Sequence, residues 1–453
     1  MSRVITLIPN DKVGTYMAGP GIRYWEFARV LSRHFHVKLI IPPYIKVANE
    51  INFSSLPFSV QHCKNTAEFR AAVERSDVII TLGVIVFLYP FLTQLNKPLV
   101  LDIYNPFLLE GLQRDVDTDV LSRWTTFESD LQALRQQLLV GDFFVCASER
   151  QRDFWLGMLA AVGRINPYTH LQDPTLRQLI DVVPFGLPGA APQHTHPVLK
   201  GVYPGIAADD QVILWAGGVW NWLDPLSIIR AMPLILEKRP RAKLFFMGIK
   251  RPNPSTPNLK AVEAAIALSK ELGFFDRYVF FNDWVAYHER QNFLLEADVG
   301  ISLHLDHIET HFSFRTRLLD HLWAGLPTIA TRGDTLGSKM AEYGVARLVA
   351  PRDVPGIAHA VTEFLIDEGR REKLQPQFYQ LASRYHWEVV CQPLVQFCQS
   401  PYQAPDKNHL TQHFAMRNRR SMPYKVYRAL RMGGVAGLLR QIKEYLHFWY
   451  NQS

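Results

Sequence analysis

The sequence predicts an α/β protein made of two Rossmann-like, doubly wound domains that face a central cleft, followed by a helical tail. Short β-branched runs alternate with longer helical patterns along both halves of the chain, as in parallel sheets covered on both faces. The alternation stops once, near Val183-Pro-Phe-Gly, where five prolines interrupt residues 184–204. The 453 residues, 48% of them hydrophobic, suffice for two cores and exclude a disordered, collagen-like or coiled-coil chain.

The first half is predicted to be one parallel sheet between helices. The expected strands are Val4–Ile8, Val37–Ile41, Val78–Leu82, Pro98–Asp102 and Phe143–Ala147, and the helices Tyr24–Arg33, Ala67–Arg75, Ser122–Leu139 and Arg150–Leu159. The uncharged run 78–96 has the length of a membrane span, but Gly83 and Pro90 interrupt it, so we interpret its start as a buried strand. We place this domain at residues 1–184 and a linker at 185–205.

The second half repeats the alternation and is predicted to form a domain of the same class at residues 206–400. Its expected strands are Val212–Ala216, Lys243–Met247, Tyr278–Phe281, Val299–Leu303, Thr328–Thr331 and Arg347–Val349, with helices at Pro225–Glu237, Leu259–Leu272, Arg290–Glu296, Ser313–Ala324 and Gly337–Tyr343. Ligands of such sheets bind at the carboxyl ends of the strands. The functional site is therefore expected in the cleft between the domains.

The positive charge of the chain is concentrated in the tail, residues 401–453. The tail holds nine Lys and Arg against two Asp and Glu, which leaves 49 − 9 = 40 basic and 42 − 2 = 40 acidic residues before it. This balance argues against a nucleic-acid partner for the body of the protein. Apolar residues recur at helical spacing over 438–449, so we predict that residues 417–450 lie on an anionic membrane surface. The alternative is a tail helix docked on the first domain.

The cysteines and the N-terminus favour a cytoplasmic protein, and the basic tail adds the prediction that it is peripheral on the inner face of the membrane. The four cysteines fit neither zinc-ligand spacing nor a dense disulfide framework. The apolar run after Met1 is too short for a secretory signal and fits a first buried strand.

The turn after the first strand is a candidate phosphate-binding loop. Gly19 and Gly21 allow the backbone to approach a ligand, the next helix offers free N–H groups, and Arg23 adds a cation. The alternative is that a tight strand–helix turn needs glycine in any case.

The equivalent turn of the second domain carries Gly217 and Gly218. Trp220 and Trp222 follow closely and are candidates for stacking on a base or a sugar ring, although paired tryptophans also occur in cores and interfaces. Asp224-Pro225 predicts the N-cap and first position of a helix.

The segment 309–331 is the most informative. Ser313 is predicted to cap a helix whose first turn contains Arg315, where a cation opposes the helix dipole unless an anion is bound. A diphosphate held by Arg315 and Arg317 would supply that anion. The alternative is that both arginines pair with carboxylates such as Glu309 or Asp306. Asp320, deeper in the helix, is a candidate for binding ribose hydroxyls.

The run Leu318-Leu-Asp-His-Leu-Trp-Ala-Gly-Leu-Pro-Thr-Ile-Ala-Thr resembles the C-terminal signature of family-4 glycosyltransferases, retaining enzymes of the GT-B fold that use nucleotide-sugar donors. The glycine loop at 19–21, Val183-Pro-Phe-Gly, the turn at 217–218 and Tyr385-His-Trp-Glu follow in the family's order. The resemblance covers about residues 1–400. It implies that Asp320 binds the nucleotide ribose.

The sequence departs from this family at two places in the second domain. Phe312 stands where the family has a carboxylate that contacts the donor sugar. The family's diphosphate-binding Arg and Lys after the first strand of this domain are replaced by Trp220-Asn-Trp-Leu-Asp. Arg315 and Arg317 are the proposed substitutes.

In the first domain, the family's histidine near the reaction centre is also missing. Asp102 and Asn105, after the strand at 98–102, are candidates for orienting donor or acceptor hydroxyls. Asp102 could equally be a structural hydrogen-bond acceptor.

These observations predict a retaining glycosyltransferase that moves a sugar from a nucleoside-diphosphate-sugar to a glycan or lipid-linked acceptor. Arg315 would stabilise the departing diphosphate, and neither a metal nor another cofactor is expected. The alternative is a non-catalytic nucleotide- or glycan-binding subunit of the same fold, because Phe312 replaces a sugar-contacting carboxylate. Inverting or non-sugar transfer on the same scaffold is a third possibility.

Overall fold

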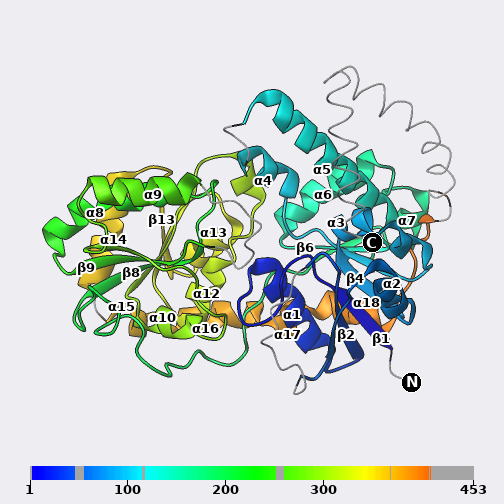
Figure 1. Ribbon diagram of the computed structural model, residues 1–453, viewed down its shortest axis with the longest axis horizontal. Helices are drawn as coiled ribbons and strands as arrows, with labels where there is room; N and C mark the ends of the chain where they lie inside the picture. The colour runs from blue at the N-terminus through cyan, green and yellow to red at the C-terminus, as the bar shows by residue number, and fades with distance from the viewer. Residues whose placement is uncertain are drawn as a thin grey trace.

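The computed structural model describes residues 3–45, 56–114, 118–250, 260–367, 369–407 and 409. Two parallel sheets lie side by side, the first in blue and cyan and the second in green and yellow in Figure 1. The predicted α/β architecture of two Rossmann-like halves is confirmed. The predicted limits 1–184, 185–205 and 206–400 stay a prediction, and the strands of the two sheets fall within 4–182 and 211–349.

The first sheet has seven parallel strands in the order β3-β2-β1-β4-β5-β6-β7. Their bounds are β1 Val4–Ile8, β2 His36–Ile41, β3 Ser59–His62, β4 Val78–Leu82, β5 Leu99–Asp102, β6 Phe143–Cys146 and β7 Ile180–Val182. β1 pairs with β2 on one side and with β4 on the other, so the strand order reverses between β1 and β4. A ligand crevice is expected where the order reverses in this way.

Helices cover both faces of this sheet. They are α1 Gly19–Leu31, α2 Thr66–Glu74, α3 Gly83–Leu88, α4 Phe107–Arg114, α5 Val120–Val140, α6 Glu149–Ala161 and α7 Pro167–Gln172. Side chains alternate along β1: Ile5 and Leu7 join one buried cluster, and Ile8 joins another on the opposite face. Both faces of the sheet are therefore core.

The run 78–96 is not one element. It contains β4, α3 and a 3₁₀ helix at Pro90–Gln94, because Gly83 starts a new helix and Pro90 ends it. Among the residues that the structure describes, no helix combines the length and the hydrophobicity needed to cross a bilayer.

The second sheet has six parallel strands in the order β10-β9-β8-β11-β12-β13. The strands are β8 Gln211–Gly218, β9 Ala242–Gly248, β10 Val279–Phe281, β11 Val299–Ser302, β12 Thr328–Thr331 and β13 Ala346–Val349. The helices are α8 Pro225–Lys238, α9 Lys260–Glu271, α10 Arg290–Glu296, α11 Ile308–Phe312, α12 Arg317–Ala324, α13 Thr335–Glu342 and α14 Val354–Ile366. Here the order reverses between β8 and β11.

The chain then returns to the first sheet. After α15 Arg370–Lys373 and α16 Gln375–Ala382, helices α17 Trp387–Val390 and α18 Gln392–Gln399, in orange in Figure 1, lie with the first half. The Trp387 ring packs against Phe27 of α1 and Phe185, with ring centroids 6.0 and 5.7 Å apart. Leu187 and His386 form a parallel bridge. The returning segment therefore joins the two halves.

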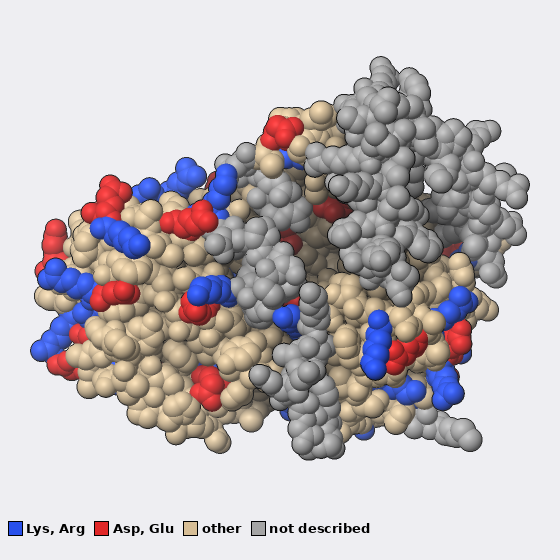
Figure 2. All heavy atoms as spheres, viewed as in Figure 1, with Lys and Arg blue, Asp and Glu red and all other residues tan. Residues whose placement is uncertain are grey.

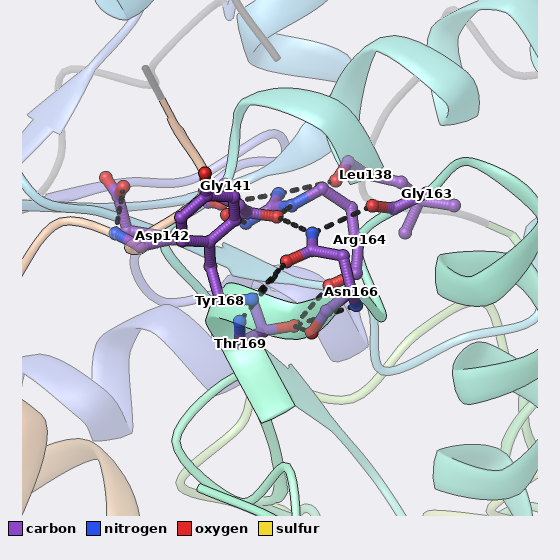
Figure 3. Close-up of polar contacts among 10 residues, drawn as sticks. Leu138, Gly141, Asp142, Gly163, Arg164, Asn166, Tyr168 and Thr169 are labelled. Atoms are coloured by element: carbon purple, nitrogen blue, oxygen red, sulfur yellow. Dashed lines mark hydrogen bonds and ion pairs between the residues drawn. The ribbon is translucent and has the colours of Figure 1, made fainter. Parts of the chain in front are cut away.

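Buried ion pairs fix the segment after α18 on the first half (Figure 3). Arg164 donates to both carboxylate oxygens of Asp406, at 2.9 and 3.2 Å, and each side chain is 1% exposed. Asn166 also donates to Asp406, at 2.8 Å, and Lys407 pairs with Asp142 at 2.5 Å. The described chain thus ends firmly against the first sheet. The predicted membrane-binding stretch 417–450 lies outside the described residues.

On the face shown in Figure 2, basic and acidic side chains of the described residues are interspersed over both halves. No patch of a single sign gathers among them on that face, which agrees with the balanced charge of residues 1–400.

Candidate functional site

The carboxyl ends of β8 and β11, where the strand order reverses and which we call the crevice of the second sheet, bring together the glycine pair and one of the two predicted arginines. Gly217 has φ +81°, and a Cβ at this position would meet nothing within 4 Å. The carbonyl oxygen of Gly218 accepts a hydrogen bond from Arg317 Nη2 at 2.7 Å. The loops after the two strands also touch, because Leu223 and His304 form an antiparallel bridge. We call Gly217, Gly218 and Arg317 the arginine site.

Arg317 is a half-buried cation without a carboxylate in an ion pair with it among the described residues. Its guanidinium lies 4.7 Å from the ring centroid of Trp215, and its buried Nη1 has no hydrogen-bond partner. Burial, and after it the nearby Arg315 guanidinium, lowers the pKa of Arg317 to about 9. The group is still charged at neutral pH. A half-buried cation of this kind is costly unless an anion binds beside it.

Arg315 is placed differently from the prediction. Its two terminal nitrogens donate to the two carboxylate oxygens of Glu309, at 3.0 and 2.7 Å, and the side chains are 8% and 1% exposed. The fork of the guanidinium is therefore filled by a carboxylate. The diphosphate role predicted for Arg315 is wrong for this arrangement. The alternative of carboxylate pairing holds for Arg315 but not for Arg317.

The predicted helix Ser313–Ala324 is also corrected. Ser313 is extended, with φ −76° and ψ 156°, and it ends α11 instead of capping α12. Its hydroxyl donates to the Thr310 carbonyl at 3.1 Å. The helix begins at Arg317, because the pairing of Arg315 with Glu309 holds the preceding residues in a turn. This places Arg317 at the N-terminus of α12.

Asp320 lies one turn into α12. The ribose contact predicted for it requires a carboxylate oxygen that a ligand can reach. One of its oxygens accepts from Arg290 Nε at 3.0 Å, and its side chain is 31% exposed. Arg290 in turn lies 3.8 Å from the ring centroid of Tyr287. Asp320 is thus oriented by a cation while part of it remains accessible.

The two tryptophans of the β8 turn stack on each other. The ring centroids of Trp220 and Trp222 are 4.9 Å apart with an interplanar angle of 17°, and both rings pack against the core of the second half. Their predicted stacking on a ligand stays a prediction. The helix cap is confirmed, since Asp224 accepts from the backbone N–H of Ser227 at 3.1 Å and Pro225 begins α8.

In the first half, Arg23 and Asp102 bind each other, although the sequence predicted separate ligand contacts for them. Arg23 donates to Asp102 at 2.6 and 2.9 Å and to the Val183 carbonyl at 2.7 Å, and both acidic and basic side chains are fully buried. Burial alone would lower the pKa of Arg23, but the Asp102 carboxylate raises it. The predicted phosphate role of Arg23 and the hydroxyl-orienting role of Asp102 are therefore corrected to a structural ion pair.

The other first-half candidates are largely used within the fold. A Cβ on Gly21 would overlap the carbonyl oxygen of Lys12, so this glycine is required by a close backbone contact. Gly19 begins α1, and a Cβ there would meet only Phe185, at 3.7 Å. The amide of Asn105 donates to Glu110 at 2.9 Å. The structure does not bring these residues to the arginine site.

Contacts across the boundary between the halves involve the start of α6, where the position of Arg150 after a strand predicted that it faces the cleft. Arg150, at the start of α6, donates to the carbonyls of His311 and Gly333 at 3.2 and 2.7 Å. Gln151 donates to the carbonyl of Phe312 at 2.8 Å. The Phe312 ring lies 4.8 Å from that of Phe154, so the side chain that replaces the expected carboxylate packs against the first half.

One further residue at the crevice was missed, His304. It follows β11, is 2% exposed, and its Nε2 has no hydrogen-bond partner. The sequence could have indicated it, because His304 is a polar residue directly after a predicted strand. No three His, Cys, Asp or Glu side chains of the described ranges gather closely enough to hold a metal ion.

Comparisons with known proteins identify the class of this chain. Residues 210–367 match the family described as Glycosyl transferases group 1. Sucrose-phosphate synthase from Thermosynechococcus elongatus is similar in structure, with a TM-score of 0.65 and 16% identity over 88% of this chain and 98% of that one. WaaG, a glycosyltransferase involved in lipopolysaccharide biosynthesis, gives 0.60 and 14% over 87% and 100%. HepE of Anabaena in complex with UDP and glucose gives 0.60 and 14% over 88% and 100%. No curated protein matches by sequence.

The chain is a glycosyltransferase of the GT-B fold. Its second half contains a domain of the Glycosyl transferases group 1 family, over the residues that build the arginine site. The predicted family-4-like class is confirmed.

Proposed function

We propose that this glycosyltransferase transfers a sugar, with retention of configuration, from a nucleoside-diphosphate-sugar to a glycan or lipid-linked acceptor. We propose further that it needs no metal or other cofactor, and that it acts in the cytoplasm at the inner face of a membrane. The observation that carries the proposal is Arg317, a half-buried guanidinium whose buried Nη1 has no partner and which has no carboxylate in an ion pair with it among the described residues.

The chemistry of the reaction explains why such a cation is useful. When the bond between the sugar and the diphosphate breaks, negative charge grows on the leaving diphosphate. Arg317 Nη1 would donate to that group, and the positive end of the α12 dipole would add to the attraction. Gly217 and Gly218 leave the backbone open beside it. Because Nη1 of Arg317 is shielded from water before the ligand arrives, its attraction for the leaving diphosphate is stronger than that of an exposed arginine.

The donor class is also supported by the similar structures. HepE of Anabaena is described in complex with UDP-glucose, and trehalose-6-phosphate from E. coli is described as bound with UDP-2-fluoro glucose. The proposal assigns the same class of donor to this chain and leaves the base and the sugar to experiment. Asp320, oriented by Arg290, would accept a ribose hydroxyl through its accessible side.

The experiment measures the binding of UDP, GDP and ADP to the wild-type chain by calorimetry and thermal stabilisation. Replacement of Arg317 by Met should weaken the nucleotide that binds by about 10- to 100-fold, since a hydrogen bond to a charged group contributes about 1.5–3 kcal/mol. The melting temperature without ligand should stay equal or rise, because the variant removes an unpaired half-buried charge. Unchanged nucleotide affinity in the Met variant would refute the role of Arg317.

A matched control is the variant Arg230→Met, which removes an exposed arginine from α8 in the same half. It should leave nucleotide affinity and melting temperature unchanged. The stereochemistry of the product, read by NMR from the anomeric coupling in the product formed from an α-linked donor, tests retention. An inverted product would contradict that part of the proposal.

The membrane part of the proposal is tested by truncation after residue 416. Partition onto vesicles of phosphatidylglycerol should be lost, since each basic residue near an anionic surface contributes about 1 kcal/mol. Nucleotide affinity should be retained, because the arginine site lies in the second half and the described chain ends on the first. Equal vesicle binding by the truncated and complete chains would remove this part of the proposal.

A further inference from the structure

His304 is held rigidly at the crevice of the second sheet. Its backbone N–H donates to the Thr331 hydroxyl at 3.2 Å, and its backbone bridges to Leu223 in the loop that leaves the arginine site. The residue is 2% exposed. Its backbone is therefore fixed by the end of β12 and by the loop after β8.

The hydrogen bond at Nδ1 defines the tautomer of this ring. Nδ1 lies 3.3 Å from the carbonyl oxygen of Leu305, which can only accept, so Nδ1 carries the proton. Burial, followed by the Arg315 cation, lowers the pKa of His304 to about 3, so the imidazole is neutral. Nε2 is then a bare acceptor, and it has no donor among its neighbours. A buried acceptor without a donor destabilises a fold and is satisfied when a ligand hydroxyl reaches it.

The ring lies near the boundary between the two halves. A Cβ on Gly333 would come within 3.9 Å of His304 Cε1, the ring carbon next to Nε2. The carbonyl of the same Gly333 accepts from Arg150 of the first half. His304 is thus separated by one peptide from the surface where the two halves meet.

The buried carboxylates in this neighbourhood, Glu309 and Asp334, are already occupied, whereas His307 Nε2 in the same loop has no partner either. Both oxygens of Glu309 accept from Arg315. Asp334 accepts from the backbone N–H groups of Arg315 and Gly337, at 3.2 and 2.5 Å. Phe312, at the position where the resemblance expects a sugar-contacting carboxylate, has no acceptor in its side chain and packs on Phe154. A sugar entering here needs another acceptor for its hydroxyls.

We propose that His304 Nε2 accepts a hydrogen bond from a hydroxyl of the donor sugar and so takes the recognition role that Phe312 cannot perform. This inference rests on the proposed function, because the sugar must be delivered by a nucleotide bound at the arginine site. His304 is a specificity-determining residue in this arrangement. It discriminates a sugar nucleotide from the bare nucleotide.

The experiment compares the dissociation constant of each sugar nucleotide with that of its bare nucleotide. UDP-glucose, UDP-galactose and UDP-N-acetylglucosamine are each compared with UDP, and GDP-mannose is compared with GDP. For the pair that the wild-type chain distinguishes best, His304→Phe should reduce the preference for the sugar nucleotide by about three- to tenfold, the range of one neutral hydrogen bond. Affinity for the bare nucleotide should not change. His304→Gln, which keeps an acceptor, should retain part of the preference.

A purely structural role predicts a different pattern. It would lower the melting temperature of the ligand-free His304→Phe variant and leave the preference ratio intact, whereas the proposed role keeps the melting temperature and lowers the ratio. His304→Leu is measured as well, so that a failure of the Phe ring to fit does not decide the result. His307→Phe removes the other unpartnered histidine nitrogen of this loop and should keep the wild-type ratio; a loss of preference in this variant, with none in His304→Phe, would overturn the assignment to His304.

The outcomes separate this inference from the proposed function. If no nucleotide binds to the wild-type chain, both fail. If nucleotides bind through Arg317 but the His304→Phe and His304→Leu chains keep the wild-type ratio, or if no sugar nucleotide in the panel binds better than its nucleotide alone, the inference about His304 is overturned and the proposed function stands.

Discussion

The glycine turns of the two halves look alike in sequence but carry arginines in opposite electrostatic states. In the first half Arg23 forms a buried ion pair with Asp102 and donates to the Val183 carbonyl, and it lies among the rings of Phe27 and Tyr104; its Nη1 has no partner, but its charge is balanced by the carboxylate. In the second half Arg317 has a carbonyl and an aromatic ring beside it but no carboxylate in an ion pair. The same residue type therefore holds the fold together in one half and is left to bind an anion in the other.

The difference depends on what stands at the end of the neighbouring strand. β5 ends in Asp102, which faces Arg23, whereas β11 ends in Ser302 and leads to the neutral His304. A carboxylate at a strand end neutralises the adjacent cation, and its absence leaves a charge for a ligand. The comparison teaches that the charge balance of the crevice, and not the glycine turn, distinguishes a binding site from a structural one.

The largest effect is expected when the buried Arg23–Asp102 ion pair of the first half is broken. Asp102→Ala leaves the fully buried Arg23 charge without its partner, so the free energy of unfolding should fall by about 3–5 kcal/mol. Urea unfolding followed by tryptophan fluorescence measures this change. The double variant Arg23→Met with Asp102→Leu is the control and should recover most of the loss. A loss below about 1 kcal/mol would mean that the pair is not the structural element described above.

Gly21→Ala tests the glycine turn of the first half, which we call the closed turn because the Lys12 backbone lies against Gly21. The added Cβ would overlap the Lys12 carbonyl oxygen, which belongs to the backbone and cannot rotate away. Overpacking of this kind costs about 1–3 kcal/mol. The melting temperature should drop, while nucleotide binding by the remaining folded protein should be unchanged. A variant of wild-type stability would show that the loop at Lys12 shifts freely.

The sequence predicted the sheets well, because buried parallel strands are continuous apolar runs such as Val78–Leu82, in which every residue is buried. β3 escaped prediction because Ser59–His62 is a largely exposed edge strand without such a run. The start of α12 was misplaced because Arg315 is drawn to Glu309, a side-chain contact that competes with the helix.

The candidate site was harder to predict because its electrostatics depend on distant residues. Asp102 lies 79 positions from Arg23, and no local pattern links them. Arg317 was predicted to bind an anion together with Arg315, and only the fold shows that one of the two is already occupied. Strand ends and glycine turns can thus be located from sequence, whereas the partner of each charge cannot.

The third prediction uses pH to test whether the buried His304 imidazole is neutral in the folded protein. His304 has a folded pKa of about 3 against a usual value near 6.5, so the unfolded chain takes up a proton first as the pH falls. Its contribution to stability is complete above pH 6.5 and is lost on the way toward pH 3. At pH 5.5 the loss should be about 1.4 kcal/mol relative to pH 7.5. Urea unfolding at the two pH values should therefore show a smaller acid loss for His304→Phe than for the wild-type chain, and equal losses would contradict a neutral buried imidazole.

The smallest effect on stability is expected for Gly218→Ala, the counterpart of Gly21→Ala in the open turn. A Cβ on Gly218 would make ordinary contacts of 3.5 Å with Trp220 and Trp284, and its backbone is not left-handed, so the free energy of unfolding should change by less than about 0.5 kcal/mol. Nucleotide affinity should nevertheless fall, because a methyl group beside the arginine site keeps a diphosphate from the backbone. Calorimetric titration with the nucleotide that binds the wild-type chain measures this. If Gly218→Ala binds nucleotide as well as the wild-type chain, the diphosphate does not lie against this turn. The difference between the glycine turns of the two halves would then depend only on the charge of Arg317, and not on the space beside Gly218.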